Sequence, residues 1–169
     1  MDEKDIHKMI RVNQAGEYGA TRIYKGQLAV FKNDPIIQEM AEQEAIHLKR
    51  FNQLLIEKKV RPTVLQPIWH VAGYLLGMTT ALAGKKVAHA CTIAVETVID
   101  RHYQEQLDQL KSYLEQEDLR QLVAECHLEE LEHREAAIQE GGEKAPGYSA
   151  LSEAVQTISK LAIWLSKKI

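Results

Sequence analysis

The sequence contains few residues that build cross-links, turns or strands, with only 2 cysteines and 4 prolines among 169 residues. Cys91 and Cys126 lie far apart and outside any Cys-x-x-Cys pattern, so we expect neither a disulfide framework nor a thiolate site for zinc or rubredoxin-type iron. Both are expected to pack as small hydrophobic side chains. No segment alternates as a β-strand does, and no Gly-rich dinucleotide-binding motif is present. We therefore expect an all-α chain without a nicotinamide-binding domain of its own.

An excess of charge of one sign is also missing. The formal net charge is −3 and the pI is about 6.2, and no basic stripe is interleaved with aromatic residues, so no nucleic-acid partner is expected. The acidic start at residues 1–5 resembles neither a secretory signal nor a transit peptide, so we expect either a protein that stays in its compartment or a mature form that has already lost its leader. The length suits a single domain, residues 1–169, around one core.

Apolar residues recur with a helical period along almost the whole chain. Asp34 is expected to cap a helix that has Pro35 at its first position. The expected helices cover residues 5–32, 35–59, about 86–114, and 119–139 after a turn at 115–118, and a last helix is capped by Ser149 and ends near 168. The first four predict a four-helix bundle, and the connection of about 25 residues between the second and third suits the long crossover of a ferritin-like bundle.

One pattern occurs twice: a lone Glu on one helix, followed at the distance of a helical hairpin by a Glu-x-x-His on the next. The two sets are Glu17 with Glu44 and His47, and Glu96 with Glu130 and His133. Residues i and i+3 share a helix face, so each Glu-x-x-His can approach a metal from one side while the lone Glu completes a half-site. Four carboxylates and two imidazoles are the ligands of a two-metal site inside a four-helix bundle.

The surroundings of these residues favour a metal. Glu17 and Glu96 lie in small or apolar stretches, where a carboxylate is expected to be buried and to need a cation or a partner. Oxygen-rich ligation with one imidazole per metal favours iron, then manganese, over zinc or copper. A single Glu-x-x-His arises readily by chance, and the alternative is that these are surface residues of a charged bundle. The neighbouring carboxylates are assigned to solvated faces: Glu42, Glu129, Glu132 and Glu135.

Two tyrosines repeat with the same spacing. Tyr24 and Tyr103 each follow a lone Glu by seven residues, or two helical turns, and are expected to point into the bundle. For Tyr103 a redox or substrate-positioning role competes with that of a core tyrosine whose hydroxyl is satisfied.

Residues 68–83 form an apolar segment with a single titratable residue, a histidine. The segment is shorter than the roughly 20 residues that span a bilayer, so we expect an interfacial hairpin or crossover helix instead. Trp69 and Tyr74 are then placed at the level of lipid headgroups, with Lys85 and Lys86 towards anionic lipid. The alternative is a crossover buried in the protein.

The last helix has an expected core stripe formed by Leu151, Ala154, Val155, Ile158, Leu161, Ala162, Leu165 and Ile169. Ile163 and Trp164 fall off this stripe. Apolar residues outside a core face suggest contact with lipid, with a second subunit or with a partner protein.

Four sequence blocks resemble the demethoxyubiquinone hydroxylase family. They are residues 12–20 (VNQAGEYGA), 61–65 (RPTVL), 90–96 (ACTIAVE) and 129–133 (EELEH). The resemblance implies a ferritin-like di-iron monooxygenase that uses O2 to hydroxylate the ring of a polyprenyl quinone precursor in ubiquinone biosynthesis. It also implies NADH as the electron source and a lipid-binding biosynthetic partner protein or a homo-oligomer as partners. The implied location is peripheral, on the cytoplasmic face of a bacterial inner membrane or the matrix face of the mitochondrial inner membrane.

By the same resemblance, Glu44 and Glu130 are bridging ligands, Glu17 and Glu96 terminal ligands, and His47 and His133 nitrogen ligands. The chain departs from the family at Gln14, where the family often has His, and at the uncharged Ala45 and Ile46. Neither departure removes a ligand. A rubrerythrin- or ferritin-like di-iron or di-manganese oxidase or peroxidase shares the ligand set and remains the alternative, and a helical adaptor without metal is a third class.

Overall fold

The computed structural model describes residues 2–168 of the chain. Its α-helices are α1 (Glu3–Val30), α2 (Pro35–Glu57), α3 (Gln66–Leu82), α4 (Lys85–Leu110), α5 (Glu117–Gln139) and α6 (Tyr148–Lys168). Two short 3₁₀ helices, η1 (Leu114–Gln116) and η2 (Gly142–Lys144), lie at either end of α5. Residues 2–168 contain no strand, so the all-α prediction is confirmed.

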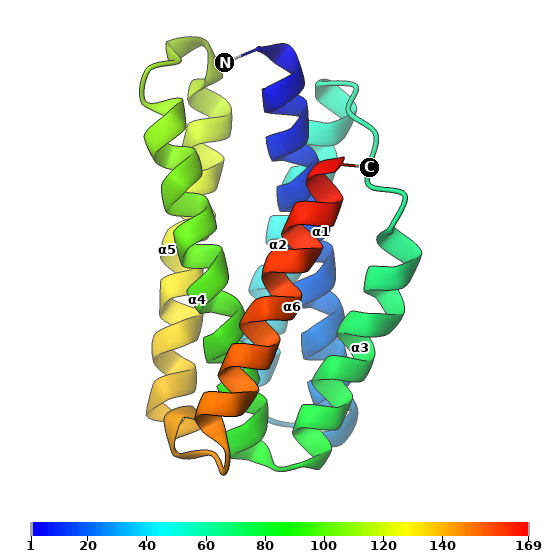
Figure 1. The fold of residues 1–169 in the computed structure, drawn as a ribbon, viewed down its shortest axis with the longest axis vertical. Coiled ribbons are helices and arrows are strands. Elements are labelled where there is room, and N and C mark those ends of the chain that lie inside the picture. Colours follow the sequence, from blue (N-terminus) through cyan, green and yellow to red (C-terminus); the bar gives the residue numbers. More distant parts are fainter. Residues whose placement is uncertain (1, 169) are drawn as a thin grey trace.

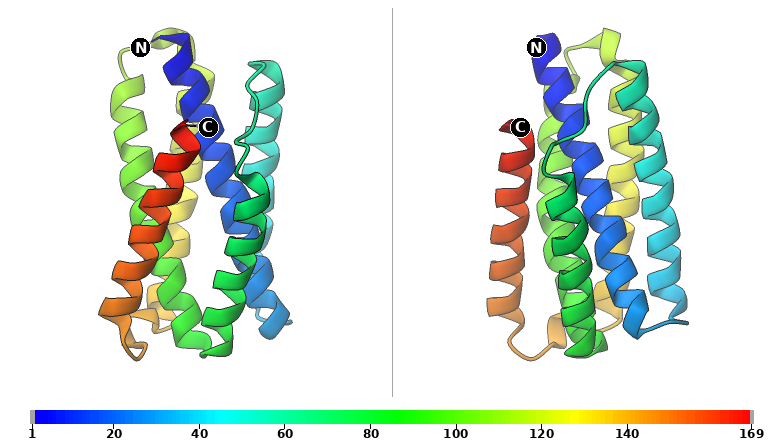
Figure 2. Two further views of the ribbon diagram at one scale, coloured as in Figure 1. Left: turned by 45° about the vertical axis from the view of Figure 1, so that its right-hand side comes forward. Right: turned by 90° about the vertical axis from the view of Figure 1, so that its right-hand side faces the viewer.

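Four of the helices form a bundle, and the other two lie outside it (Figure 1). α1 and α2 form one antiparallel hairpin, and α4 and α5 form the second. α3 is the crossover between the hairpins and lies mainly along α1, while α6 packs on α4 and α1. Figure 2 shows α3 and α6 on either side of α1. The predicted long crossover is therefore itself a helix on the outside of the bundle.

Local signals predicted some helix ends correctly and missed others. The Asp34 side chain accepts hydrogen bonds from the backbone amides of Ile36 and Ile37, at 3.1 and 3.2 Å, and thus caps α2 as expected. α4 ends at Leu110, so Leu114 belongs to η1 and not to the long helix. Ser149 is the second residue of α6 and not its N-cap.

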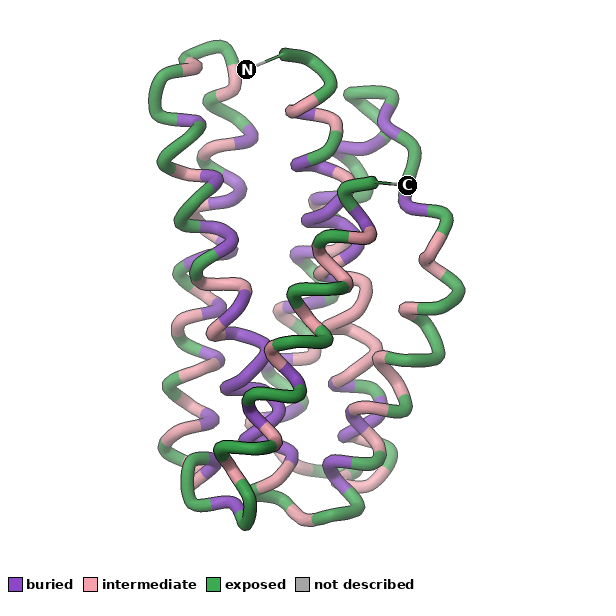
Figure 3. Tube along the Cα trace, viewed as in Figure 1, coloured by how far each residue is buried: buried purple, intermediate pink, exposed green. Residues whose placement is uncertain are grey.

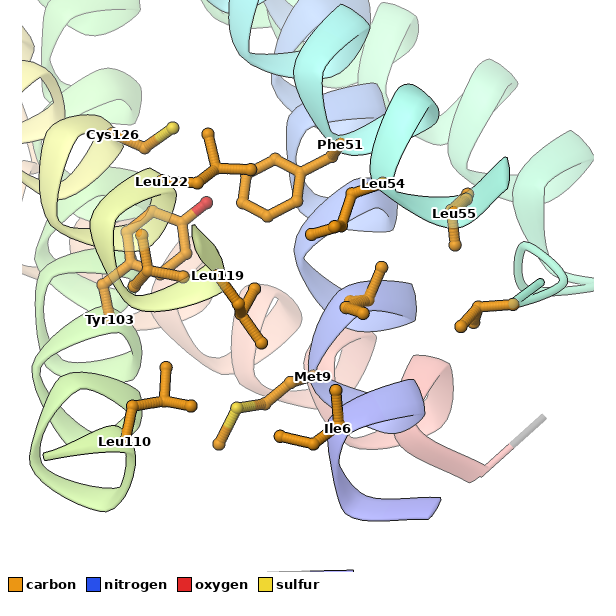
Figure 4. Packing of buried hydrophobic residues seen from close by; sticks show 13 residues of the cluster. Ile6, Met9, Phe51, Leu54, Leu55, Tyr103, Leu110, Leu119, Leu122 and Cys126 are labelled. Carbon is orange, nitrogen blue, oxygen red and sulfur yellow. The ribbon is translucent and has the colours of Figure 1, made fainter. Parts of the chain in front are cut away.

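The bundle has an apolar cluster at each end. The first joins the start of α1 and α5 to the end of α2 and α4, and Figure 4 labels ten of its members: Ile6, Met9, Phe51, Leu54, Leu55, Tyr103, Leu110, Leu119, Leu122 and Cys126. The second, near the end of α1 and the start of α2, contains Tyr24, Ile37 and Met40. Both cysteines are fully buried and free, as predicted. The middle of the bundle is thus closed to water from both ends.

Glycines bring α3 unusually close to α1. A Cβ atom on Gly77 would lie 1.9 Å from the Ile23 carbonyl oxygen, and one on Gly26 would lie 2.2 Å from that of Tyr74. Gly73 meets Gly19 in the same way. Small residues at such a contact allow two helix backbones to approach each other.

The outward side of α3 is exposed, because its buried residues are only Gly77, Thr80 and Ala81. The alternative of a buried crossover is therefore wrong. Among residues 2–168, no helix combines the length and apolar character needed to cross a bilayer.

α6 is rotated relative to the expected core stripe. It buries Ser152, Val155 and Ser166, whereas Ile158 and Leu161 are more than half exposed. Figure 3 shows that most of α6 is exposed or intermediate along its length. α6 touches the bundle along a narrow line of mostly small residues, and its larger aliphatic side chains lie to the sides of this line. Ile169 lies outside the described residues.

Candidate metal centre

The structure brings the six candidate ligands together in the middle of the bundle, where each of these residues is at most 3% exposed. One group contains Glu17, Glu44, His47 and Glu130, and the other contains Glu44, Glu96, Glu130 and His133. In each group, one ligand atom from every residue lies within 4.8 Å of the others. Glu44 and Glu130 belong to both groups, so the arrangement is that of two adjacent half-sites with two shared carboxylates.

Both histidines turn the same nitrogen towards the carboxylates. His47 Nδ1 lies 3.2 Å from Glu17 Oε2 and 3.3 Å from Glu130 Oε1. His133 Nδ1 lies 3.1 Å from Glu130 Oε2 and 3.4 Å from Glu44 Oε1. The Nδ1 atoms are therefore the ones that face a metal position.

Several atoms of this cluster have no hydrogen-bond partner within the described chain: Glu17 Oε2, both carboxylate oxygens of Glu44, and His47 Nδ1. Burial raises the pKa of Glu44 and of Glu96 well above the usual range, and the nearby Glu130 carboxylate raises both further. A dry interior with so many carboxylates needs positive charge. The unpartnered oxygen and nitrogen donors therefore fit a pair of iron or manganese ions.

The two repeated tyrosines lie in the interior and bond to the lone glutamates in a crossed manner. The Tyr103 hydroxyl donates to Glu17 Oε1, and the Tyr24 hydroxyl donates to Glu96 Oε1 at 3.4 Å. Burial raises the pKa of both tyrosines well above the usual value, which keeps the hydroxyls protonated as donors. Each tyrosine thus supports the lone Glu of the other hairpin.

Two polar residues bond the candidate histidine ligands, a role that the sequence had not indicated for either of them. His47 Nε2 donates to Glu129 Oε2 at 2.9 Å, so Glu129, whose side chain is 37% exposed at the edge of the bundle, also contacts a candidate ligand. His133 Nε2 donates to Gln43 Oε1 at 2.8 Å. Glu42, Glu132 and Glu135 are exposed, as expected. The missed signal is positional, because Gln43 and Glu129 each stand directly before the Glu of a Glu-x-x-His.

Cys126 also approaches this cluster, near Glu17 and His47. Burial raises the pKa of Cys126 to about 11, so the group is a neutral thiol at physiological pH. Cys126 is at the same time a member of the apolar cluster at one end of the bundle.

An apolar groove with a volume of about 240 Å³ lies beside the carboxylates, between α3 and α6, and its floor is formed by α1 and α4. A smaller cavity of about 30 Å³ touches Glu17, Glu44, Glu96 and Glu130 together with Tyr103. Six residues line both spaces: Val12, Gly16, Ala20, Val95, Ile99 and Ile163. The groove therefore leads to the candidate ligands.

The two walls of the groove meet where Trp69 Nε1 donates to Ser166 Oγ at 3.2 Å. Trp69 thus has a partner within the protein, and the Tyr74 ring lies 5.3 Å from the Arg22 guanidinium; the placement of both aromatic residues at the level of lipid headgroups stays a prediction. The two helices that form the walls also carry exposed apolar side chains, of which Ile158 lines the groove: Ile68, Val71 and Leu75 on α3 and Ile158, Leu161 and Trp164 on α6.

A sequence model of the family described as "Ubiquinone biosynthesis protein COQ7" matches residues 4–166. The chain belongs to the COQ7 family. The predicted resemblance is thereby confirmed over nearly the whole sequence.

Relatives of this COQ7-family chain are named as hydroxylases. The mitochondrial NADPH-dependent 3-demethoxyubiquinone 3-hydroxylase of Dictyostelium discoideum is 49% identical over 168 residues, which cover 97% of this chain and 77% of that protein. The 3-demethoxyubiquinol 3-hydroxylase of Rhodospirillum rubrum is 44% identical, with 97% and 78% covered. The mitochondrial NADPH-dependent 3-demethoxyubiquinone 3-hydroxylase of Homo sapiens is 45% identical, with 97% and 78% covered.

Proposed function

We propose that this chain is a di-iron, O2-dependent monooxygenase that hydroxylates the ring of a demethoxyubiquinone-type polyprenyl quinone in ubiquinone biosynthesis. One observation carries the proposal: the apolar groove and the cavity at the carboxylates share six lining residues. A flat ring on an apolar tail can reach the candidate ligands along this path while its tail stays in the groove. The names of the COQ7 relatives support the same reaction.

The residues that would hold the metals are those of the two half-sites: Glu17 and His47 on one side, Glu96 and His133 on the other, with Glu44 and Glu130 between them. When bound and reduced, the iron pair supplies the electrons and Lewis acidity that activate O2. NADH is the proposed source of these electrons. NADPH should be assayed beside NADH, because the names of several relatives include NADPH.

The chain itself binds and orients the ring. Gly16 and Ala20 offer little side-chain bulk on the floor, so a ring can come close to Glu17 on the same helix. Ile99 and Ile163 border both spaces and exclude water from around the ring. The Tyr103 hydroxyl holds Glu17 in position. A dry site strengthens the electrostatic interactions within it.

We further propose that α3 and α6 rest on a membrane surface. Both helices form walls of the groove and carry exposed apolar side chains, so a polyprenyl tail could pass from lipid into the groove without crossing water. The matching face is the cytoplasmic side of a bacterial inner membrane or the matrix side of the mitochondrial one. A lipid-binding biosynthetic partner protein or a second copy of the chain are the other proposed occupants of this face.

Incubation of the iron-loaded protein with a demethoxyubiquinone analogue, NADH and O2 tests the reaction, with the hydroxylated quinone measured by mass spectrometry. Glu44→Ala should abolish the product and the stoichiometric binding of two irons, because Glu44 belongs to both half-sites. Glu42→Ala, an exposed carboxylate on the same helix, is the matched control and should behave as wild type. Peroxide consumption without quinone hydroxylation would favour the rubrerythrin-like alternative instead.

A further inference from the structure

The duplicated motif is one residue longer than Glu-x-x-His. Its copies are residues 43–47 (QEAIH) and 129–133 (EELEH), and the first residue of each copy bonds the histidine of the other. Glu129 Oε2 accepts from His47 Nε2, and Gln43 Oε1 accepts from His133 Nε2. Both bonds connect α2 with α5 across the bundle. They occupy equivalent places in the two hairpins.

These bonds determine which imidazole nitrogen is free to bind a metal. An Nε2 atom that donates to an oxygen carries the proton, which leaves the lone pair of Nδ1 directed at the carboxylates. Partners of this kind orient a histidine ligand and raise its basicity. Gln43 and Glu129 therefore position His47 and His133 without touching a metal themselves.

The two copies differ at this position in one chemical respect. The acceptor for His47 is a carboxylate, whereas the acceptor for His133 is a neutral amide. A hydrogen bond to a carboxylate is stronger than one to an amide and draws the Nε2 proton further from the ring. The Glu129 side chain is 37% exposed, so solvent hydrates the carboxylate and its charge is tolerated at the edge of the bundle. His47 is thereby the more strongly donating imidazole.

We propose that Glu129 and Gln43 are positioning residues that make the two half-sites unequal, so that the half-site of His47 binds metal more tightly than that of His133. This inference rests on the two-metal site proposed above. We assign the inequality to the difference between a carboxylate and an amide at this one position, so exchange of the two groups should reverse it.

Anaerobic titration of the metal-free protein with Fe(II), followed by calorimetry and by Mössbauer spectroscopy of the loaded protein, tests this inference. The wild-type protein should bind two irons in unequal steps and show two distinct iron environments. Glu129→Gln should weaken the first step by about tenfold or more and bring the two environments closer together. Gln43→Glu should tighten the second step. The double exchange, Gln43→Glu with Glu129→Gln, should again give two unequal steps, with the half-site of His133 now the tighter one.

Glu132→Gln is the matched control, since it removes the same charge from an exposed position on α5. It should leave both binding steps and both iron environments unchanged. Two irons bound by every variant with unaltered steps and spectra would overturn this inference and leave the metal site standing. Failure of the wild-type protein to bind two irons would overturn the metal site as well. The two single variants change opposite hairpins, so a folding defect in one leaves the other as the test.

Discussion

At the scale of single residues, side chains of one hairpin form hydrogen bonds with side chains of the other hairpin in the middle of the bundle. Tyr103 supports Glu17 and Tyr24 supports Glu96, while Glu129 supports His47 in the same crossed manner. A buried polar atom without a partner destabilises a fold, so each of these bonds ties one hairpin to the other. The site is therefore also a part of what holds the bundle together.

Tyr103→Phe should lower the hydroxylation rate by about tenfold while two irons remain bound, because Glu17 stays in place but loses its fixed orientation. The free energy of unfolding of the metal-free protein should fall by about 1–3 kcal/mol, since Glu17 Oε1 is left unpaired. Product formation and chemical denaturation measure the two effects. Tyr24→Phe, whose bond to Glu96 is long at 3.4 Å, should have the smaller effect. A wild-type rate in Tyr103→Phe would leave Tyr103 as a packing residue only.

At the scale of elements, the position of α3 depends on the absence of side chains where it meets α1. The backbones touch at Gly77 and Gly26, and the bulkier residues of α3 are thereby turned towards the groove and the outer surface. This contact sets the distance between one wall of the groove and its floor on α1. Gly73 and Gly77, within the apolar segment, are therefore packing residues against α1.

Gly77→Ala should reduce the free energy of unfolding by about 1–3 kcal/mol, because the new methyl group overlaps the Ile23 carbonyl oxygen and α3 must move. Urea denaturation measures the change. Gly19→Ala is the control on the facing helix, where a Cβ atom meets nothing within 4 Å. It should raise the free energy of unfolding by about 0.5–1 kcal/mol, since alanine favours the helix. Equal stability of Gly77→Ala and wild type would contradict this account of the helix contact.

At the scale of the whole molecule, the two helices outside the bundle form one apolar face around the groove. α6 contributes to it because its larger aliphatic residues lie beside its line of contact with the bundle. If the substrate is a lipid quinone, a groove that opens on the membrane-facing surface lets the substrate enter directly from lipid.

Trp164→Lys and Leu161→Lys should each weaken binding to phosphatidylcholine vesicles and leave the iron content unchanged, because a charge on this face must stay in water. Vesicle flotation and metal analysis measure both quantities. Leu128→Lys is the matched control: Leu128 is 62% exposed and Leu161 53%, but Leu128 lies on α5, away from α3 and α6. Unchanged vesicle binding in both α6 variants would exclude this face as the membrane contact.

The sequence alone predicted those features that depend on local order along a helix. The helical period predicted the all-α bundle, Asp34 and Pro35 predicted the start of α2, and the duplicated spacing selected the six buried residues that the structure brings together. The helical period determines which face of a helix a side chain occupies, and the spacing in sequence determines its position along the helix axis. Both can therefore be inferred from a single sequence. The end of α4 and the start of α6 were predicted less accurately, since α4 ends at Leu110 and Ser149 lies inside α6.

Only the tertiary structure decided how the faces meet. Three features depend on the relative positions of separate helices. They are the bond between Glu129 and His47, the exposure of the aliphatic residues of α6, and the path from the groove to the carboxylates. A helical period says which residues share a face, but it contains no information about which neighbour that face meets. The carboxylates and imidazoles were thus determined by the sequence, whereas their partners and the path to them arise from packing between helices.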